Sequence, residues 1–249
     1  MDTQIEECLA SLRSRHMKGI FAENSEEACL KILGLIPQNG VVGIGDSTAV
    51  KQIDIVRALV ERGTKVLDPF ELKGDQIDPR EAYEYTERVA REASLSDVFL
   101  TGTNALTQDG RLVNVDGNGN RVAGMFWGHP ISIIVVGRNK IVRDLDEAFH
   151  RIRNIIAPHH IYIRTAESSG RKFKTPCAAT GECNDCKSSD RVCNIFTIIE
   201  GKPFRTDINV IIVDEDLGLG WDDSWPKSRI MKIIDNHKRF LWIPKFDVL

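Results

Sequence analysis

The sequence predicts an α/β protein whose sheet is mostly parallel and carries helices on both faces. Strand-like runs alternate with helical segments along most of the 249 residues. Most of these runs are apolar throughout, as is typical of strands buried on both faces, and the connections between them are short. These three observations favour a single α/β domain over residues 1–249.

The first third of the chain contains two helical patterns before its first clear strand. Residues 3–16 place their apolar side chains at the spacing of one helical face. A second helix is expected to begin after Asn24 or Ser25, either of which is a good N-cap, and to end before Pro37. The run GVVGIG at 40–45 then predicts a buried strand.

The next elements continue the alternation. A broad apolar face predicts a helix over 47–62, and 65–67 predicts a short strand. Asp78-Pro79-Arg80-Glu81 is a well-formed helix start, because Asp78 can cap the helix and Pro79 suits its first position. This helix is expected to run to about Ser94.

The remainder predicts five strands, at 97–102, 111–115, 131–137, 195–200 and 208–214. A helix is expected over 144–156. The segment 165–194 interrupts this alternation with polar sequence that contains four cysteines, and we interpret it as a metal-binding insertion. Residues 219–249 form an aromatic-rich C-terminal tail that we expect to pack onto the body or onto a second subunit, so a homodimer is possible.

Charge and composition narrow the classes of partner. Thirty-three Lys and Arg against thirty-six Asp and Glu give a net charge of −3, so we expect no nucleic-acid partner. The N-terminus is acidic where a signal peptide would be basic. No segment approaches the roughly 18 apolar residues of a membrane span. We therefore expect a cytoplasmic protein with no membrane span, in a compartment where disulfides are rare.

Two glycine-rich segments fall at predicted strand ends, where open α/β sheets bind ligands. The first is VVGIGDSTAV, whose candidate ligand-binding residues are Gly43, Gly45, Asp46, Ser47 and Thr48. Glycines would let a small anion approach the backbone, and the two hydroxyls could donate to it. A plain strand-to-helix turn explains this segment equally well. Its spacing matches neither the dinucleotide fingerprint nor the P-loop, so no flavin or NAD motif is present.

The second segment, TGTNALTQDGRLVNVDGNGNR, covers residues 101–121. Gln108-Asp109-Gly110 is a good hairpin turn, but turns alone do not require so many amides and carboxylates. Residues 116–121 could form a polar, backbone-lined cup with one guanidinium. The candidate ligand-binding residues here are Asn104, Asp109, Gly117, Asn118, Gly119 and Asn120.

Four of the six cysteines lie close together, as Cys177-x5-Cys183-x2-Cys186-x6-Cys193. A CxxC pair with two further cysteines in a short segment of a reducing compartment is a strong metal signal. Four thiolates suit either zinc or an iron–sulfur cluster, and we favour a 4Fe-4S cluster. The other two cysteines lie on apolar helical faces and are interpreted as core residues.

These motifs resemble those of the lactate-utilisation (LUD) domain family, in the branch that carries a four-cysteine insertion. The resemblance rests on TGTNALTQDGRLVNVDGNGNR, on IIVVGRNKIVRDLDEAFHRIRNIIAP and on the cysteine segment. It implies a fold similar to ribose-5-phosphate isomerases and CoA transferases (NagB/RpiA-like), with Lys140 where the isomerases carry a lysine after a central strand. Asp46 departs from the isomerase loop and would repel a phosphate, which argues against a sugar-phosphate ligand.

The resemblance also implies a link with the oxidation of lactate to pyruvate in multi-protein systems. For that chemistry, Arg121 and Lys140 could clamp a small carboxylate, and Asp116 or His129 could act as base. An iron–sulfur cluster passes single electrons, so the two-electron step would need a redox partner protein or another cofactor.

Two hypotheses for the function stay open. In the first, the chain is an oxidoreductase component for a 2-hydroxy acid, and a cluster on the four cysteines relays electrons. In the second, it is an isomerase- or transferase-like enzyme, or a domain that binds small anions, with structural zinc on the same cysteines.

Overall fold

The structure is a computed structural model that describes residues 2–71, 78–168 and 172–242. Its centre is a six-stranded sheet in the order β1-β10-β7-β4-β2-β3, with every neighbouring pair parallel. The α/β class with a mostly parallel sheet is therefore confirmed. The bounds of these strands are Lys18–Ala22 (β1), Val42–Ile44 (β2), Val66–Leu67 (β3), Val98–Gly102 (β4), Ile131–Gly137 (β7) and Asp207–Val213 (β10).

A second, four-stranded sheet in the order β8-β5-β6-β9 lies beyond the end of the first. Its strands are Ala105–Thr107 (β5), Leu112–Asp116 (β6), Ile141–Val142 (β8) and Ile195–Ile199 (β9). Strands β5 and β6 form the predicted hairpin, whose turn places Gly110 at φ +87°, a conformation that favours glycine. Because β5 follows β4 and β8 follows β7, the two sheets meet where the central parallel strands end.

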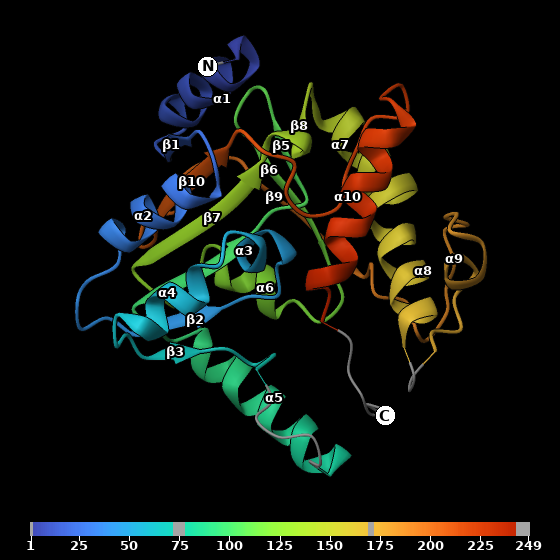
Figure 1. Ribbon diagram of the computed structural model, residues 1–249, viewed down its shortest axis with the longest axis horizontal. Coiled ribbons are helices and arrows are strands. Elements are labelled where there is room, and N and C mark those ends of the chain that lie inside the picture. Colours follow the sequence, from blue (N-terminus) through green and yellow to red (C-terminus); the bar gives the residue numbers. More distant parts are fainter. Residues whose placement is uncertain (1, 72–77, 169–171, 243–249) are drawn as a thin grey trace.

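Helices cover both faces of the main sheet (Figure 1). The helices are Thr3–Ser14 (α1), Ser25–Leu35 (α2), Thr48–Gln52 (α3), Ile55–Glu61 (α4), Pro79–Ala93 (α5), Asn120–Gly124 (α6), Leu145–Arg151 (α7), Ala157–Glu167 (α8), Pro176–Thr180 (α9) and Lys227–Phe240 (α10). Alternate residues of β7 supply the two cores. Ile133 and Val135 face α2, α3 and α4, whereas Ile134 and Val136 face α1 and α6. This division is the physical basis of the uniformly apolar strands.

Two predicted helices differ from those observed. The helix expected over 47–62 is divided into α3 and α4, because Asp54 adopts a left-handed conformation at φ 57°. The helix expected over 144–156 does not end before Pro158. A π-helical turn over Ile152–Ile156 joins α7 to α8, and Pro158 lies in the first turn of α8, where its missing N–H costs least.

The C-terminal segment packs onto its own chain. Trp221 and Ile233 are buried with Ile155 and Ile163 in a small core that joins α10 to α8. Residues 243–249, which include Phe246 of the predicted tail, lie outside the described residues. A homodimer stays a prediction.

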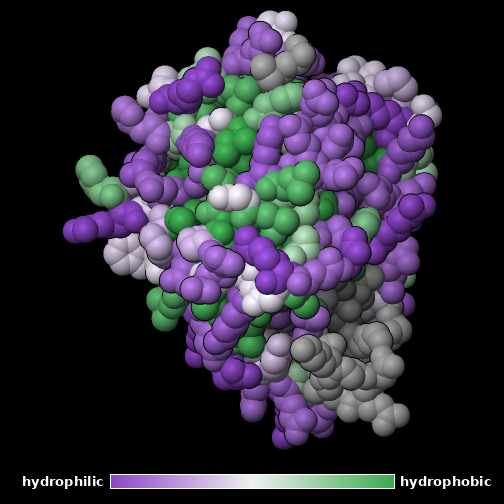
Figure 2. All heavy atoms as spheres, turned by 60° about the vertical axis from the view of Figure 1, so that its left-hand side comes forward, coloured by the Kyte–Doolittle hydropathy of each residue, from purple (hydrophilic) through white to green (hydrophobic). Residues whose placement is uncertain are grey.

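Hydrophobic residues also gather near the centre of one face of the molecule, surrounded by hydrophilic ones (Figure 2). Among the described helices, none is both long and apolar enough to cross a membrane.

Candidate functional site

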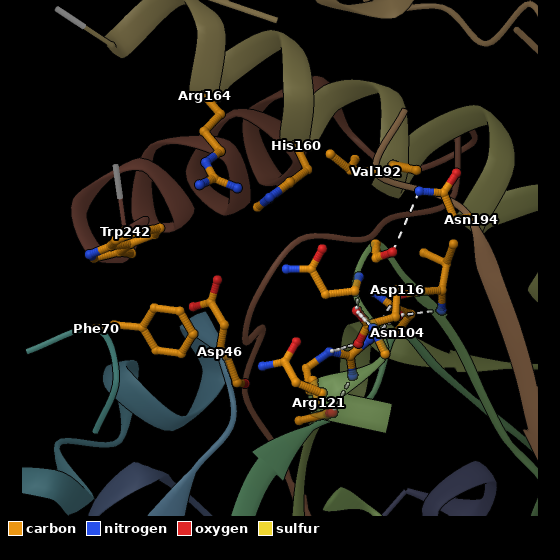
Figure 3. Close-up of a pocket in the computed structure, with 18 of the residues that line it drawn as sticks. Asp46, Phe70, Asn104, Asp116, Arg121, His160, Arg164, Val192, Asn194 and Trp242 are labelled. Atoms are coloured by element: carbon orange, nitrogen blue, oxygen red, sulfur yellow. Dashed lines mark hydrogen bonds and ion pairs between the residues drawn. The ribbon is translucent and has the colours of Figure 1, made fainter. Parts of the chain in front are cut away.

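A cavity of about 900 Å³ lies at the carboxyl ends of the central strands. The loops after β2, β4 and β6 and the residues after β7 meet there, and α8 and α10 cover it from the other side (Figure 3). The predicted residues brought together are Asp46, Ser47, Thr48, Asn104, Asp116, Gly117, Asn118, Gly119, Asn120, Arg121 and Lys140. The two glycine-rich segments therefore form one site.

Three predicted ligand-binding residues do not line this cavity. Asp109 lies in the β5–β6 turn and pairs with Arg15 and Arg111. Gly43 and Gly45 have roles in packing instead. A Cβ on Gly43 would lie 2.3 Å from the carbonyl oxygen of Ala93, and one on Gly45 would lie 2.8 Å from the Thr101 hydroxyl. These glycines allow the close approach of neighbouring elements.

His129, a candidate base in the sequence, lies outside the cavity lining as well. Its ring stacks on that of Phe99 at 5.4 Å between centroids, and the side chain is buried.

The guanidinium of Arg121 is held by protein acceptors on several sides. Its terminal nitrogens donate to the carbonyl oxygens of Gly102 and Val115, and to the side-chain oxygens of Asn104 and Asn114, at 2.8–3.1 Å. Its Nε lies 3.5 Å from a carboxylate oxygen of Asp116. Arg121 therefore fastens the end of β4 to β6 and to the loop that follows. This arrangement suits a positioning residue better than a substrate clamp.

Asp116 organises the backbone of the same loop. One carboxylate oxygen accepts hydrogen bonds from the N–H groups of Asn118 and Gly119, at 3.1 and 3.0 Å. The other accepts a longer one from Val122. Gly119 lies at φ +91°, which favours glycine at this turn. The cup predicted from DGNGNR is therefore a loop wrapped around a carboxylate.

Lys140 is buried at the end of β7, and its Nζ donates to the carbonyl oxygen of Thr103 at 2.9 Å. Burial, together with the charge of Arg121, lowers the pKa of Lys140 to about 7. A substantial fraction of this side chain is therefore an uncharged amine near neutral pH.

Gly218 packs directly against this lysine. Its φ is +67°, and a Cβ there would lie 2.6 Å from the Nζ of Lys140. Gly218→Ala is expected to cost more stability than the roughly 1–3 kcal/mol of backbone strain alone, because the methyl group must also displace Lys140. Gly63→Ala is the matched control, since Gly63 has φ +80° and its Cβ would meet nothing within 4 Å. If denaturant unfolding showed that both variants lose the same free energy of unfolding, the contact between Gly218 and Lys140 would be contradicted.

Two histidines that the sequence patterns did not reveal as site residues lie over the cavity. His160 comes from α8 and, with Arg164, points towards the side that carries Asp46 and Arg121 (Figure 3). His237 comes from α10, and its Nδ1 lies 3.1 Å from the Thr48 hydroxyl. The two rings meet edge to face at 5.7 Å. His160 lies within α8, because the helix continues past it to Glu167.

Both histidines are uncharged in the folded protein. Burial, with smaller contributions from neighbouring positive charges, lowers the pKa values of His160 and His237 to about 3. The unfolded chain takes up these protons below about pH 6.5, so the free energy of unfolding should fall as the pH drops towards 3. Each histidine contributes up to about 1.4 kcal/mol per pH unit.

His237→Asn is expected to flatten this pH dependence. Its denaturant midpoint should change less between about pH 7 and pH 5 than that of the unmodified protein. If the midpoint of His237→Asn changed as much between the two pH values as that of the unmodified protein, His237 would not be neutral and buried.

The four clustered cysteines line a second, small cavity of about 30 Å³. The Thr175 hydroxyl lies 3.2 Å from the Cys177 sulfur, and the N–H of Asp185 donates to the Cys183 sulfur at 3.5 Å. Burial, and the proximity of Cys186 and Cys193, raise the pKa of the Cys177 thiol. In the described part of the chain, no three His, Cys, Asp or Glu side chains are close enough together to hold a metal ion. The cysteines thus share one cavity without forming a closed set of ligands.

The two cavities share a wall. Ala157, Arg191 and Val192 line both of them. Arg191 donates to the carbonyl oxygens of Cys186 and Cys193, at 2.7 and 3.1 Å. On the other side, the backbone N–H of Asn194 donates to the carbonyl oxygen of Asp116 at 3.0 Å, and its side chain to that of Gly117. The cysteine segment is therefore fastened to the loop that forms the cup.

The fold and this site define an α/β protein with a large polar cavity at the carboxyl ends of a parallel sheet and a cysteine-lined cavity beside it. The chain belongs to the LUD domain family, whose sequence model matches residues 5–213.

Comparison with solved structures finds a DUF162 family protein from Deinococcus radiodurans, with 15% identity and a TM-score of 0.43, over 84% of this chain and 94% of that one. It also finds ribose 5-phosphate isomerase A from Neisseria gonorrhoeae, with 18% identity and a TM-score of 0.31, over 49% of this chain and 54% of that one. No curated protein matches the sequence.

Proposed function

We propose that this protein is a redox component of a system that oxidises lactate, or a related 2-hydroxy acid, to the 2-oxo acid. Membership of the LUD domain family supports an association with lactate utilisation. In this proposal the large cavity binds the small carboxylate, and the four cysteines hold an iron–sulfur cluster. When bound, the cluster would accept and donate one electron at a time.

The observation that carries the proposal is the wall shared by the two cavities. In this proposal a carboxylate in the large cavity lies on one side of Ala157, Arg191 and Val192, and the group held by the cysteines lies on the other. A structural zinc on the same cysteines would gain nothing from this proximity. The proximity suits a centre that must exchange electrons with a neighbouring site.

The cysteine cavity suits an inorganic group in its chemistry as well. Four cysteines line it together with Arg153 and Arg191, whose positive charges would offset the negative charge of bound thiolates, although both arginines also pair with Asp185. The hydroxyl of Thr175 and the N–H of Asp185 already contact two of the sulfurs. Hydrogen bonds of this kind tune the reduction potential of a cluster.

The large cavity offers polar side chains suited to a small hydroxy or oxo acid. Asp46 repels a doubly charged phosphate more strongly than a singly charged carboxylate, whereas amides and hydroxyls such as Asn104, Asn120 and Thr48 can recognise hydroxyl and carbonyl oxygens. Within the described residues no dinucleotide-binding loop lines the cavity. The two-electron step would therefore take place with a partner protein or with a cofactor that it supplies.

Purification without air, followed by metal and sulfide analysis, tests the proposal. We expect roughly four iron and four sulfide per chain, with a brown absorption that bleaches on reduction with dithionite. A colourless protein that contains zinc and does not respond to dithionite would overturn it and favour the structural-zinc hypothesis.

A further inference from the structure

Lys140 combines burial with access to the large cavity. It ends the 3-10 turn Arg138–Lys140 that follows β7, and only 7% of it is exposed. Lys140 lines the cavity, and its Nζ donates to the carbonyl oxygen of Thr103. Among the described residues it forms no ion pair with a carboxylate. Buried lysines ordinarily need such a partner to keep their charge.

The surroundings of Nζ favour the uncharged amine. A proton on Lys140 would place a second cation near the guanidinium of Arg121, at a buried position. The two histidines that cover the cavity are neutral, so they do not supply the negative charge that a protonated Lys140 would need. This explains the lowered pKa described above.

A hydroxyl lies near the amine. The position that a Cβ of Gly218 would occupy is 2.6 Å from the Nζ of Lys140 and 3.4 Å from the Oγ1 of Thr48. Thr48 is in turn in hydrogen-bond contact with Nδ1 of His237, whose buried Nε2 has no partner among the described residues. Thr48 and His237 thus border the space around Nζ, and both are uncharged.

A desolvated, uncharged lysine beside another cation is a nucleophile for carbonyl carbon. We propose that Lys140 forms a reversible imine with the keto group of a 2-oxo acid bound in the large cavity. The inference rests on the proposed function, because it takes the class of ligand from it. In this inference Lys140 is a covalent nucleophile and not the carboxylate clamp that the sequence suggested.

The step balances without an oxidant or a reductant. The lone pair of Nζ attacks C2 of the 2-oxo acid, and the carbonyl oxygen takes up a proton to become a hydroxyl group. The nitrogen then loses its protons, and the hydroxyl leaves as water, so that a C=N bond replaces the C=O bond. Solvent in the large cavity supplies and takes up these protons. An imine withdraws electrons from C3, which prepares the acid for proton exchange or for carbon–carbon bond chemistry at that atom.

Borohydride trapping tests the proposal on the full chain, purified without air. The protein is incubated with pyruvate near pH 8, reduced with sodium borohydride, digested and mapped by mass spectrometry. We expect the peptide that contains Lys140 to gain the mass of pyruvic acid less one oxygen atom, as the dominant labelled lysine. Labelling should be lost in Lys140→Arg and kept in Lys51→Arg, a matched control because Lys51 pairs with Asp46 beside the cavity.

Equilibrium dialysis with labelled pyruvate separates the two proposals. Pyruvate binding without label at Lys140 would overturn the imine and leave the carboxylate site of the proposed function standing. Absence of both binding and label would count against both. If Lys140→Arg does not fold, the mapped position of the label in the unmodified protein decides, and label spread over surface lysines would overturn the imine.

Discussion

Cys186→Ser is expected to remove the visible absorption and nearly all of the iron from protein purified without air, while the sheet stays folded. Cys186 lines the cysteine-lined cavity, its carbonyl oxygen accepts a hydrogen bond from Arg191, and the closed coordination of a cluster needs all four thiolates. The main cores lie on the two faces of the six-stranded sheet and contain none of the four clustered cysteines. Iron content, the absorption spectrum and circular dichroism measure the two parts of this prediction.

Cys29→Ser is the matched control for this variant. Cys29 lies on α2, half-buried against the core of the main sheet and on the opposite side of the molecule from α9 (Figure 1), so its substitution should leave the iron content unchanged. If Cys186→Ser kept its full iron content, or if both variants lost the same amount of iron, the assignment of the cluster to the four clustered cysteines would be contradicted.

Arg121→Met should lower the free energy of unfolding by about 3–5 kcal/mol, because removing one partner of a buried ion pair leaves the other uncompensated. The side chains of Arg121 and Asp116 are 12% and 9% exposed, so water cannot replace the lost contacts. The oxygens of Asn104 and Asn114 would lose a charged donor as well. Denaturant unfolding at neutral pH measures the loss.

Arg88→Met provides the comparison for this second variant. Arg88 pairs with Glu92 on the surface of α5, where both side chains are about half exposed, and such pairs contribute little. If Arg121→Met were no more destabilising than Arg88→Met, the Arg121 guanidinium would not stabilise the packing of the end of β4 against β6. Loss of pyruvate binding without loss of stability would instead favour the clamp that the sequence suggested.

The sequence predicted the central strands of the sheet, which are apolar on both faces and therefore stand out as continuous runs, but it missed β1, an edge strand whose residues are mostly partly exposed. The strand at 131–137 coincides with β7, and the helix that begins at Pro79 follows from the cap at Asp78. The strands β5 and β8, with three and two residues, are too short to produce such a pattern. Their pairing depends on contacts between segments that are distant in the chain.

The loops that line the cavity at the strand ends could be predicted from the sequence, whereas the packing of α8 and α10 over them could not. Glycines and polar residues at strand ends indicated the loops at Asp46 and Asp116, since parallel strands bring their carboxyl ends to one edge. His160 and His237 come from helices whose packing over that edge leaves no local pattern. The role of Arg121 was also hidden, because the sequence cannot show which acceptors surround a guanidinium.

We propose above that a cluster held by the cysteine segment lies next to a bound carboxylate. The most direct test is the electron paramagnetic resonance spectrum of the dithionite-reduced protein, recorded with and without saturating pyruvate. We predict a cluster signal whose line shape changes when pyruvate binds, because Arg191 and Val192 line both cavities. No cluster signal, or identical spectra from protein shown by dialysis to have bound pyruvate, would contradict the account.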